Sequence, residues 1–282
     1  MTVPSSIAAV IIARNEAANI ERCVRSVLWC DEVVVVDDRS TDGTPELAAA
    51  CGARVVTHPF ESFATQRNWA LTEAGLQSTW VLMLDADEVS TEKFQDVVRS
   101  QVERAAESAV GFQLCRKTMF FDHWLRHADG FPVWIMRIVR RSRAHFVDSG
   151  HGEVPVPQVE GVLPRIAEPF LHYPFSKGLH DWWQRHNTYS SREAEREWQA
   201  TADLNWSDVF SGDSARRRRG ARELARRLPC RPWLRFLYHY VWCCGFLDGR
   251  PGWEFSRMMA TYEGLIVLKK WELAMRDRGK RP

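Results

Sequence analysis

Residues 7–16 read IAAVIIARNE, residues 33–44 read VVVVDDRSTDGT, and residues 80–88 read WVLMLDADE. Each stretch begins with a continuous apolar run of strand length and ends in charged or small polar residues. Unbroken apolar strands are typical of parallel sheets covered on both faces, because both sides of each strand are then buried. The three stretches therefore predict an α/β fold built on a mostly parallel, Rossmann-type sheet with helices on both faces.

The rest of the chain predicts further elements. Before residue 110, apolar side chains at helical spacing indicate helices at 20–28, 45–51, 63–74 and 91–106, and a short strand is expected at 55–57. After residue 110 the pattern becomes mixed. It indicates strands at 111–116 and 133–139, irregular chain at 155–174, a helix at 179–190 and a final amphipathic helix at 254–275.

The composition excludes several classes of protein. A formal net charge of +2 and 45% hydrophobic residues are typical of a globular protein, not of a disordered or fibrous one. Seven cysteines without a C-x-x-C pair, and the lack of a secretory signal pattern, predict reduced thiols in the cytoplasm. No long apolar run is present, so no membrane-spanning helix is expected.

Acidic residues follow three of the predicted strands. Glu16 comes after the first, Asp37 and Asp38 after the second, and Asp85 and Asp87 after the strand at the start of WVLMLDADE. The carboxyl ends of parallel strands meet at one edge of a sheet, where α/β folds bind their ligands. So many carboxylates in one place need a cation or hydrogen-bond donors to offset their charge.

A nucleotide diphosphate at this edge would also need positive charge. The chain contains neither G-x-G-x-x-G after the first strand nor G-x-x-x-x-G-K-[ST], so a phosphate cradle of glycine amides is not expected. A divalent metal held by Asp87, with Asp85 as a second ligand, would bridge the protein to the phosphates. The residues alone leave another interpretation open, because Asp87 or Ser90 could instead cap the following helix.

Four stretches in this order resemble the family 2 glycosyltransferases, which have the GT-A fold: VIIARNEAANI, VVVVDDRSTDGT, ATQRNWAL and VLMLDADE. Three later stretches are similar to one branch of that family, the bacterial lipopolysaccharide inner-core glycosyltransferases and related cell-envelope sugar transferases: HWLRHADGFPVWIMRIVRR, HGEV and LHYPFSKGLHDWWQRHNTYSSREA. The resemblance implies metal-dependent, inverting transfer of a hexose. The implied donor is a nucleotide sugar, UDP-linked as in UDP-glucose, and the implied acceptor is a lipid-linked or lipopolysaccharide core glycan.

The resemblance also implies roles for individual residues. Ala13, Asn15 and Glu16 would line the donor nucleotide pocket. Asp38 would read the uracil or the ribose, and Arg67 would reach the base or the diphosphate. Asp85 and Asp87 would hold the ribose and the Mn²⁺ or Mg²⁺ on the diphosphate, where the metal offsets the charge of the leaving group.

Inverting transfer needs a carboxylate base to accept the proton of the acceptor hydroxyl. Family members carry a His-Glu pair where this chain reads His151-Gly152-Glu153, so Glu153 is the first candidate. The inserted glycine departs from the family pattern. Asp129 is the second candidate, in a loop where relatives often have glycine.

Charge divides the chain unevenly, with 9 basic and 17 acidic residues in 1–110 and 29 basic and 19 acidic in 111–282. We predict a nucleotide-sugar-binding α/β half at 1–110, an acceptor-side half of the same catalytic domain at 111–200, and a basic, aromatic-rich helical extension at 201–282. The extension contains nine arginines in 214–235 followed by an aromatic stretch at 232–248. This composition favours contact with an anionic membrane surface, on the cytoplasmic face of the inner membrane.

Three other functions are alternatives to glycosyl transfer, and each predicts a different sequence feature. A nucleotidyltransferase would need a glycine- and lysine-rich first loop, which residues 13–19 lack. A membrane-associated nucleotide-binding module without turnover would be expected to lose its acids, yet Asp38, Asp85 and Asp87 are present. Nucleic-acid binding through the arginine run is not expected, because no aromatic residues interleave with it as a stacking platform.

Overall fold

The structure is a computed structural model. It describes residues 5–149, 152–157, 160–199, 206–213, 216, 217, 220, 224, 228 and 230–279. The chain divides into two compact units. The first contains Met1–Trp124 and Phe131–Gly178, and the second contains Leu125–Gly130 and Leu179–Pro282.

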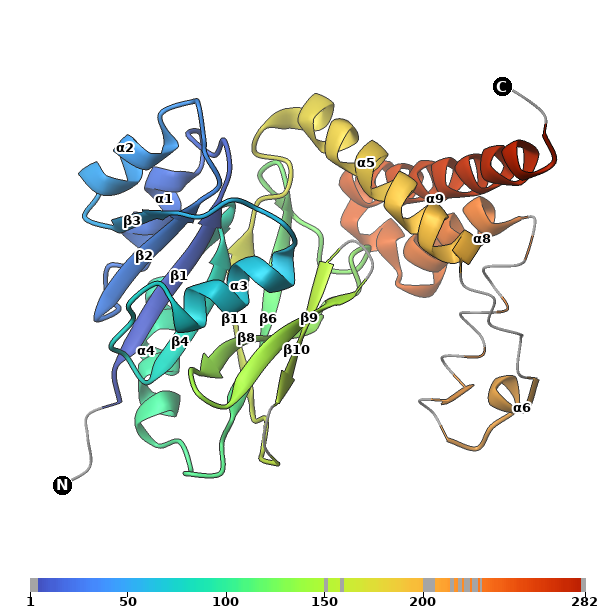
Figure 1. The fold of residues 1–282 in the computed structure, drawn as a ribbon. Helices are drawn as coiled ribbons and strands as arrows, with labels where there is room; N and C mark the ends of the chain where they lie inside the picture. The colour runs from blue at the N-terminus through green and yellow to red at the C-terminus, as the bar shows by residue number, and fades with distance from the viewer. Residues whose placement is uncertain are drawn as a thin grey trace. The chain divides into compact units, whose positions relative to one another are not determined.

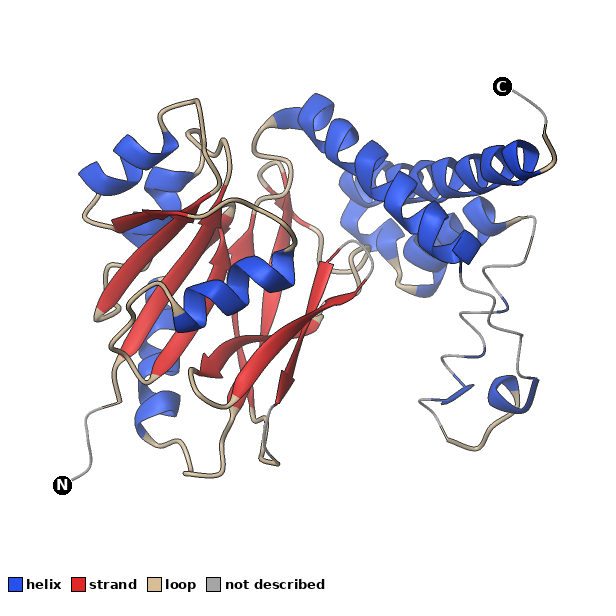
Figure 2. Cartoon of the chain, in the orientation of Figure 1, coloured by secondary structure: helices blue, strands red, loops and turns tan. Residues whose placement is uncertain are grey.

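The first unit is a nine-stranded sheet with helices on both faces (Figures 1 and 2). Its main strand order is β3-β2-β1-β4-β8-β6-β11-β5, and β7 pairs with β6. The strands are β1 (Ile7–Ala13), β2 (Glu32–Asp37), β3 (Arg54–Thr57), β4 (Trp80–Asp85), β5 (Glu88–Val89), β6 (Gly111–Phe120), β7 (His123–Trp124), β8 (Trp134–Arg140) and β11 (Arg165–His172). A separate hairpin pairs β9 (Ala144–Ser149) with β10 (Gly152–Pro157).

The strands from β3 to β4 are parallel to one another, and β8 is inserted antiparallel between β4 and β6. The helices of this unit are α1 (Ile20–Ser26), α2 (Thr44–Ala50), α3 (Phe63–Thr72) and α4 (Glu92–Glu103). The predicted α/β fold class is therefore confirmed. Because β1, β2 and β4 are parallel neighbours, the residues after them share one edge of the sheet.

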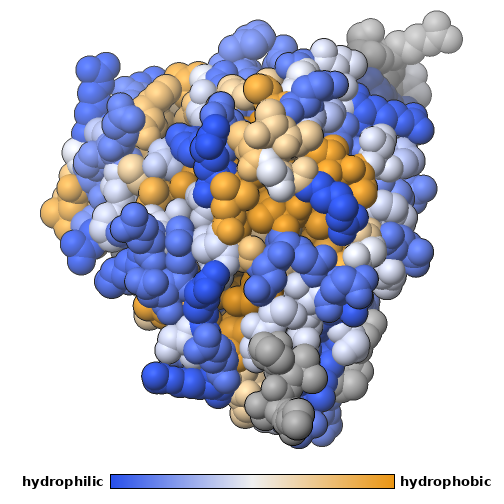
Figure 3. All heavy atoms as spheres, turned by 90° about the vertical axis from the view of Figure 1, so that its left-hand side faces the viewer, coloured by the Kyte–Doolittle hydropathy of each residue, from blue (hydrophilic) through white to orange (hydrophobic). Residues whose placement is uncertain are grey.

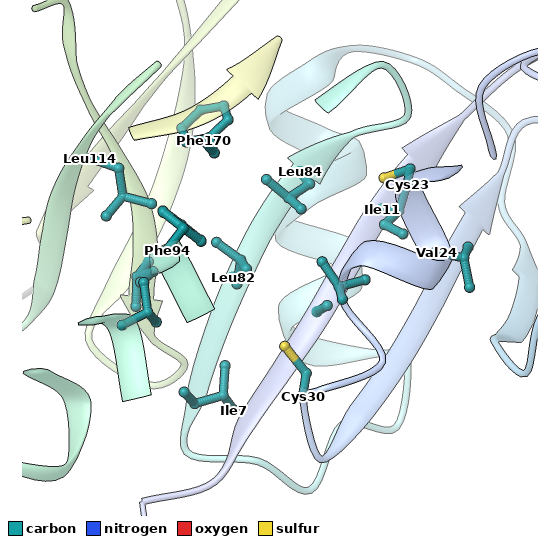
Figure 4. Packing of buried hydrophobic residues seen from close by; sticks show 14 of the residues in the cluster. Ile7, Ile11, Cys23, Val24, Cys30, Leu82, Leu84, Phe94, Leu114 and Phe170 are labelled. Atoms are coloured by element: carbon teal, nitrogen blue, oxygen red, sulfur yellow. The ribbon is translucent and has the colours of Figure 1, made fainter. Parts of the chain in front are cut away.

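Two apolar layers hold the helices on the sheet. On one face, α1 and α4 bury side chains such as Cys23 and Phe94 against Ile11 and Leu82 (Figure 4). On the other face, α3 and the start of β9 cover the alternate residues of the same strands. The buried strands thus have the two-sided covering that their unbroken apolar sequences predict.

Seen from the side of α2 and β3, the surface is mainly hydrophilic, and apolar side chains gather in a smaller patch (Figure 3).

The expectation of irregular chain at 155–174 is wrong. Most of this segment forms strands, because its prolines occupy positions where a sheet tolerates them. Pro169 lies within the irregular step of β11 between Ile166 and Phe170, and Pro155 and Pro157 lie in β10, which pairs on one side only. β11 pairs parallel with β6 on one side and antiparallel with β5, the edge strand, on the other.

The second unit is helical. Its elements are α5 (Gly178–Gln199, whose first residue belongs to the first unit), α6 (Trp206–Val209), α8 (Arg231–Leu237), a π-helical turn η1 (Tyr238–Trp242), a 3-10 turn η2 (Gly245–Asp248) and α9 (Gly249–Asp277). Ala194 of α5 packs against Tyr262 and Ile266 of α9. Trp182, which is 3% exposed, stacks on His186 with ring centroids 3.5 Å apart, so it serves the core. Within the described residues, no helix has the length and apolar character to cross a membrane.

A buried ion-pair network joins the three long helical segments of this unit. Arg231 of α8 donates to Glu197 of α5 at 2.8 Å and to Glu263 of α9, and Lys270 of α9 contacts Glu197 at 2.8 Å. The side chains of Arg231 and Glu197 are 9% and 5% exposed. Removing one partner of such a network leaves a buried charge uncompensated.

We predict that Arg231→Ala lowers the free energy of unfolding of the helical unit by about 3–5 kcal/mol. Urea titration followed by far-ultraviolet circular dichroism measures this change. Arg276→Ala is the matched control, because Arg276 forms an exposed pair with Glu272 and should cost less than about 1 kcal/mol. Equal effects of the two substitutions would contradict the network's role.

Candidate functional site

The loops after β1 and β2 are joined by hydrogen bonds at the carboxyl edge of the sheet. The Asn15 amide donates to Ser40 Oγ at 2.8 Å, and the Thr41 amide donates to Asn15 Oδ1 at 2.9 Å. The Glu16 amide donates to Thr44 Oγ1 at 2.8 Å. Asn15 has a φ of 53°, a conformation that asparagine tolerates better than most residues. The two loops therefore form one connected rim.

Asp37 and Asp38 have different surroundings at this rim. Asp37 accepts hydrogen bonds from the amide and hydroxyl of Ser40, which fixes the turn after β2. Asp38 contacts Arg14 Nη1 at 2.9 Å and accepts the Phe60 amide at 2.9 Å. Its own amide donates to the Ala13 carbonyl at 3.0 Å. Asp38 thus joins the ends of β1 and β2 to the segment before α3.

Asp85 lies between two guanidinium groups. Arg67 of α3 contacts Oδ1 and Arg137 of β8 contacts Oδ2, both at 2.6 Å. Arg137 also reaches Glu88 Oε1 at 2.8 Å, and the Asp85 amide donates to Glu88 Oε2 at 2.9 Å. Arg67 is 1% exposed and Glu88 is fully buried. The four side chains form a network of two cations and two acids at the end of β4, in which Asp85 is the exposed member, with 37% of its side chain accessible.

The network changes the proton affinities of its acids. Desolvation would raise the pKa of Asp85, but Arg137 and Arg67 outweigh it and hold that pKa well below its ordinary value. Desolvation raises the pKa of Glu88, and the attraction of Arg137 only partly opposes this. Asp85 is therefore ionised at neutral pH, and its charge balances the guanidinium groups. The Arg137 side chain is itself buried, at 9% exposed, because both of its carboxylate partners lie within this network.

Asp87 lies beside a histidine that the sequence interpretation did not select. Asp87 Oδ1 and His172 Nε2 are 3.6 Å apart, and both side chains are 14% exposed. The Tyr173 amide donates to the Asp87 carbonyl at 2.9 Å, and β5 pairs with β11 at Glu88 and His172. The position of His172 at the end of an apolar run, within LHYPFSKG, was the available signal. It was missed because β11 was read as irregular chain.

Asp87 and His172 provide two metal-binding groups at the carboxyl edge of the sheet. A carboxylate oxygen and an imidazole nitrogen are ligands for Mn²⁺, and Mg²⁺ also accepts one or two protein ligands, completing its shell with phosphate and water. In the described part of the chain there is no cluster of three or more such groups arranged for a metal. Asp87 and His172 could therefore supply two protein ligands to a metal.

Lys177 is a second residue that sequence reasoning missed. Its Nζ lies 2.6 Å from Glu16 Oε1 and 3.2 Å from the Asn15 carbonyl. The lysine follows β11, so it comes to the rim from a segment remote in the sequence. The rim thus carries a cation that comes from outside the loops after β1 and β2.

The two candidate bases lie in different settings. The backbone of Glu153 pairs opposite Asp148 in the β9–β10 hairpin, whereas His151 lies outside the described residues. Asp129 belongs to the loop Leu125–Gly130, which clusters with the second unit. The other predicted site residues lie in the first unit at the ends of β1, β2 and β4 and on α3: Ala13, Asn15, Glu16, Asp38, Arg67, Asp85 and Asp87.

Asp248 fixes the loop that carries Asp129. Its carboxylate accepts the amides of His127 and Ala128 at 2.9 and 2.8 Å and also contacts His127 Nδ1 at 2.9 Å. His239 Nδ1 donates to the Ala128 carbonyl at 2.6 Å. Burial lowers the pKa of His239 to about 4, so the ring is neutral at physiological pH. The backbone before Asp129 is therefore held by residues near the start of α9.

We predict that Arg137→Met destabilises the first unit by about 3–5 kcal/mol at neutral pH, because Glu88 loses its buried cation. The pKa of Glu88 then rises further in the folded state. Since the unfolded state releases this proton from about pH 4.3 upward, the stability of the variant should fall as pH increases until Glu88 ionises in the folded protein.

Urea titrations between about pH 4.5 and 8 test this. Arg137→Met/Glu88→Gln should recover part of the loss and flatten the pH dependence, because the buried acid is gone. Arg14→Met is the control, since the Arg14 side chain is 68% exposed. A pH-independent loss in Arg137→Met would contradict the assignment to Glu88.

Comparison with known proteins places the chain in a family. The family model described as Glycosyl transferase family 2 matches residues 8–154. An uncharacterized glycosyltransferase of Rickettsia bellii (strain RML369-C) is 43% identical over 93 residues, 33% of this chain and 31% of that protein. The lipopolysaccharide core biosynthesis glycosyltransferase LpsC of Rhizobium meliloti (strain 1021) is 26% identical over 145 residues, 50% of this chain and 53% of LpsC. The chain thus spans about a third to a half of the length of these relatives.

Among solved structures, glucosyl-3-phosphoglycerate synthase from Mycobacterium tuberculosis, in complex with Mn²⁺, UDP and glucosyl-3-phosphoglycerate, is 25% identical over 40% of this chain and 43% of that one. The TM-score is 0.33, which is too low to support an argument about the site. Family membership rests on the sequence match, which spans more than half of the chain and contains the strands and acids of the donor edge. The chain belongs to glycosyl transferase family 2.

Proposed function

We propose that this glycosyltransferase moves a hexose from a nucleotide sugar, UDP-linked as in UDP-glucose, to a lipopolysaccharide core or other cell-envelope glycan, with inversion at the sugar carbon. The observation that carries the proposal is the pairing of Asp87 with His172 beside the Asp85 network, at the sheet edge where Asp38 also lies. The similarity to LpsC supports the class of acceptor.

The donor site in this proposal uses the rim of the sheet. Ala13, Asn15 and Glu16 line the nucleotide pocket, and Asp38 accepts hydrogen bonds from the uracil or the ribose. Asp85 binds the ribose with Arg67 behind it. The two guanidinium groups on Asp85 keep the carboxylate ionised and oriented, which lowers the cost of ordering it when the nucleotide binds.

Asp87 and His172 are the proposed protein ligands of a Mn²⁺ or Mg²⁺ ion. The ion would supply positive charge to the diphosphate as the bond to the sugar breaks. Asp85 as an additional ligand stays a prediction, and both of its carboxylate oxygens contact guanidinium groups in this structure. Mn²⁺ is compatible with the imidazole of His172 as well as with the carboxylate.

Glu153 is the proposed base, and Asp129 the second candidate. The base accepts the proton of the acceptor hydroxyl while the oxygen bonds to the sugar carbon and the nucleoside diphosphate leaves from the opposite side. The acceptor is proposed to be lipid-linked, with the enzyme at an anionic membrane surface. The location on the cytoplasmic face of the inner membrane stays a prediction.

Calorimetric titration of UDP into the protein tests the donor site. We expect binding that requires Mn²⁺ and that weakens at least tenfold in Asp87→Asn and in His172→Ala, because losing an outer partner of a metal ligand already costs about 10- to 100-fold in affinity. Asp96→Asn on α4 is the matched control and should bind as the native protein does. Tight UDP binding that ignores the metal and both substitutions would overturn the metal assignment.

Transfer from radiolabelled UDP-glucose to a truncated lipopolysaccharide tests the base. Glu153→Gln should lower the rate of the transfer step by about 10²- to 10⁴-fold and leave Mn²⁺-dependent UDP binding unchanged. Asp129→Asn is the comparison variant, for which we expect a smaller loss. The opposite ranking would assign the base to Asp129.

A further inference from the structure

The helical segment from α8 to η2 exposes apolar side chains where a surface helix normally exposes polar ones. Adjacent exposed residues recur about once per turn and continue into the 3-10 turn. We call them the apolar face: Trp233, Leu234, Leu237, Tyr238, Val241, Trp242, Phe246 and Leu247. The exposed fractions of Trp242, Trp233 and Leu247 are 81%, 72% and 61%. So many exposed apolar side chains in one short segment are typical of an interaction surface.

The opposite side of the same segment is already used for packing. Phe236 stacks on Tyr240 with ring centroids 5.3 Å apart, and both rings contact Trp253 of α9 edge-on. Arg231 and His239 are buried. The segment also packs along α9 within the second unit (Figure 1). The apolar face is therefore not the side on which the segment joins its own core.

The charge around this segment fits an anionic partner. The chain has no aspartate or glutamate between Glu223 and Asp248. Of the arginines in this interval that the structure describes, Arg231 is buried in its ion pairs, whereas the Arg235 side chain is 39% exposed. At the start of α9, Arg250 and Arg257 have side chains that are 90% and 59% exposed, with Glu254 between them. Basic residues beside an exposed apolar surface favour a surface that is both apolar and negatively charged.

The residue types favour a lipid bilayer over a protein partner. Tryptophan and tyrosine combine a large apolar ring with a polar group, which suits the boundary between lipid headgroups and acyl chains. The whole apolar face falls within about 15 residues, and the described part of the chain has no helix fit to span a membrane. An element of this kind lies in the plane of the bilayer surface.

We propose that the apolar face docks on anionic phospholipid, with Trp242 and Leu247 entering the boundary between headgroups and acyl chains. The proposal deepens the proposed function, on which it rests for its biological purpose, by assigning the surface that brings the enzyme to a lipid-linked acceptor. Lipid binding itself requires neither donor nor metal, so the two proposals fail independently.

Flotation of the full chain with vesicles tests the assignment. We expect binding to phosphatidylcholine vesicles that contain phosphatidylglycerol, weaker binding to pure phosphatidylcholine, and about tenfold weaker binding of Trp242→Ser/Leu247→Ser. The matched control is Leu28→Ser/Trp271→Ser, which removes one exposed leucine and one exposed tryptophan from elsewhere, 48% and 62% exposed. The control should float as the native protein does.

Two measurements keep the test decisive. Circular dichroism and urea titration establish that each variant is folded, and sedimentation velocity reports the oligomeric state. Equal loss of flotation in both double variants, or native flotation in Trp242→Ser/Leu247→Ser, would overturn the proposal. So would a native dimer that only Trp242→Ser/Leu247→Ser dissociates, because the face would then be an interface between two copies of the chain.

Discussion

The contact of Arg137 with Asp85 and Glu88 is the constraint on which the arrangement of charges at the carboxyl edge of the sheet depends. Glu88 is fully buried beside the end of β4, and a buried carboxylate is not stable there without a cation, whereas the Asp85 side chain is 37% exposed. The cation comes from β8, which is inserted antiparallel into an otherwise parallel region of the sheet. The topology of the sheet and the electrostatics of the site are therefore one arrangement.

The uneven charge of the chain has a related explanation. The acids of the donor edge come from the first 110 residues, whereas Arg137, His172 and Lys177 come from later segments that fold back onto it. Part of the acidic excess of residues 1–110 is therefore balanced within the first unit, by contacts of its carboxylates with Arg137, His172 and Lys177. At the proposed metal site, both carboxylate oxygens of Asp85 contact guanidinium groups, and Asp87 lies 3.6 Å from His172.

The sequence predicted the first half of the fold well, because unbroken apolar strands and amphipathic helices leave little ambiguity. It predicted the carboxyl edge for the same reason, since parallel neighbours end together. It failed at β11, where prolines suggested irregular chain although Pro169 falls in an irregular step of the strand. His172 and Lys177 were missed through that error. The Arg137 contacts were missed because pairing of β8 on both sides is a long-range property that local patterns do not contain.

The segment HWLRHADGFP is divided between the two units of the chain. Its central residues Leu125–Gly130 cluster with helices that come more than 100 residues later, and Asp248 accepts two of its backbone amides. Buried amides without acceptors are costly, so this loop conformation requires the C-terminal helices. The C-terminal extension therefore holds the backbone of the loop that carries Asp129. A base at Asp129 would depend on η1 and η2 for its position, whereas a base at Glu153 would depend on the β9–β10 hairpin of the first unit.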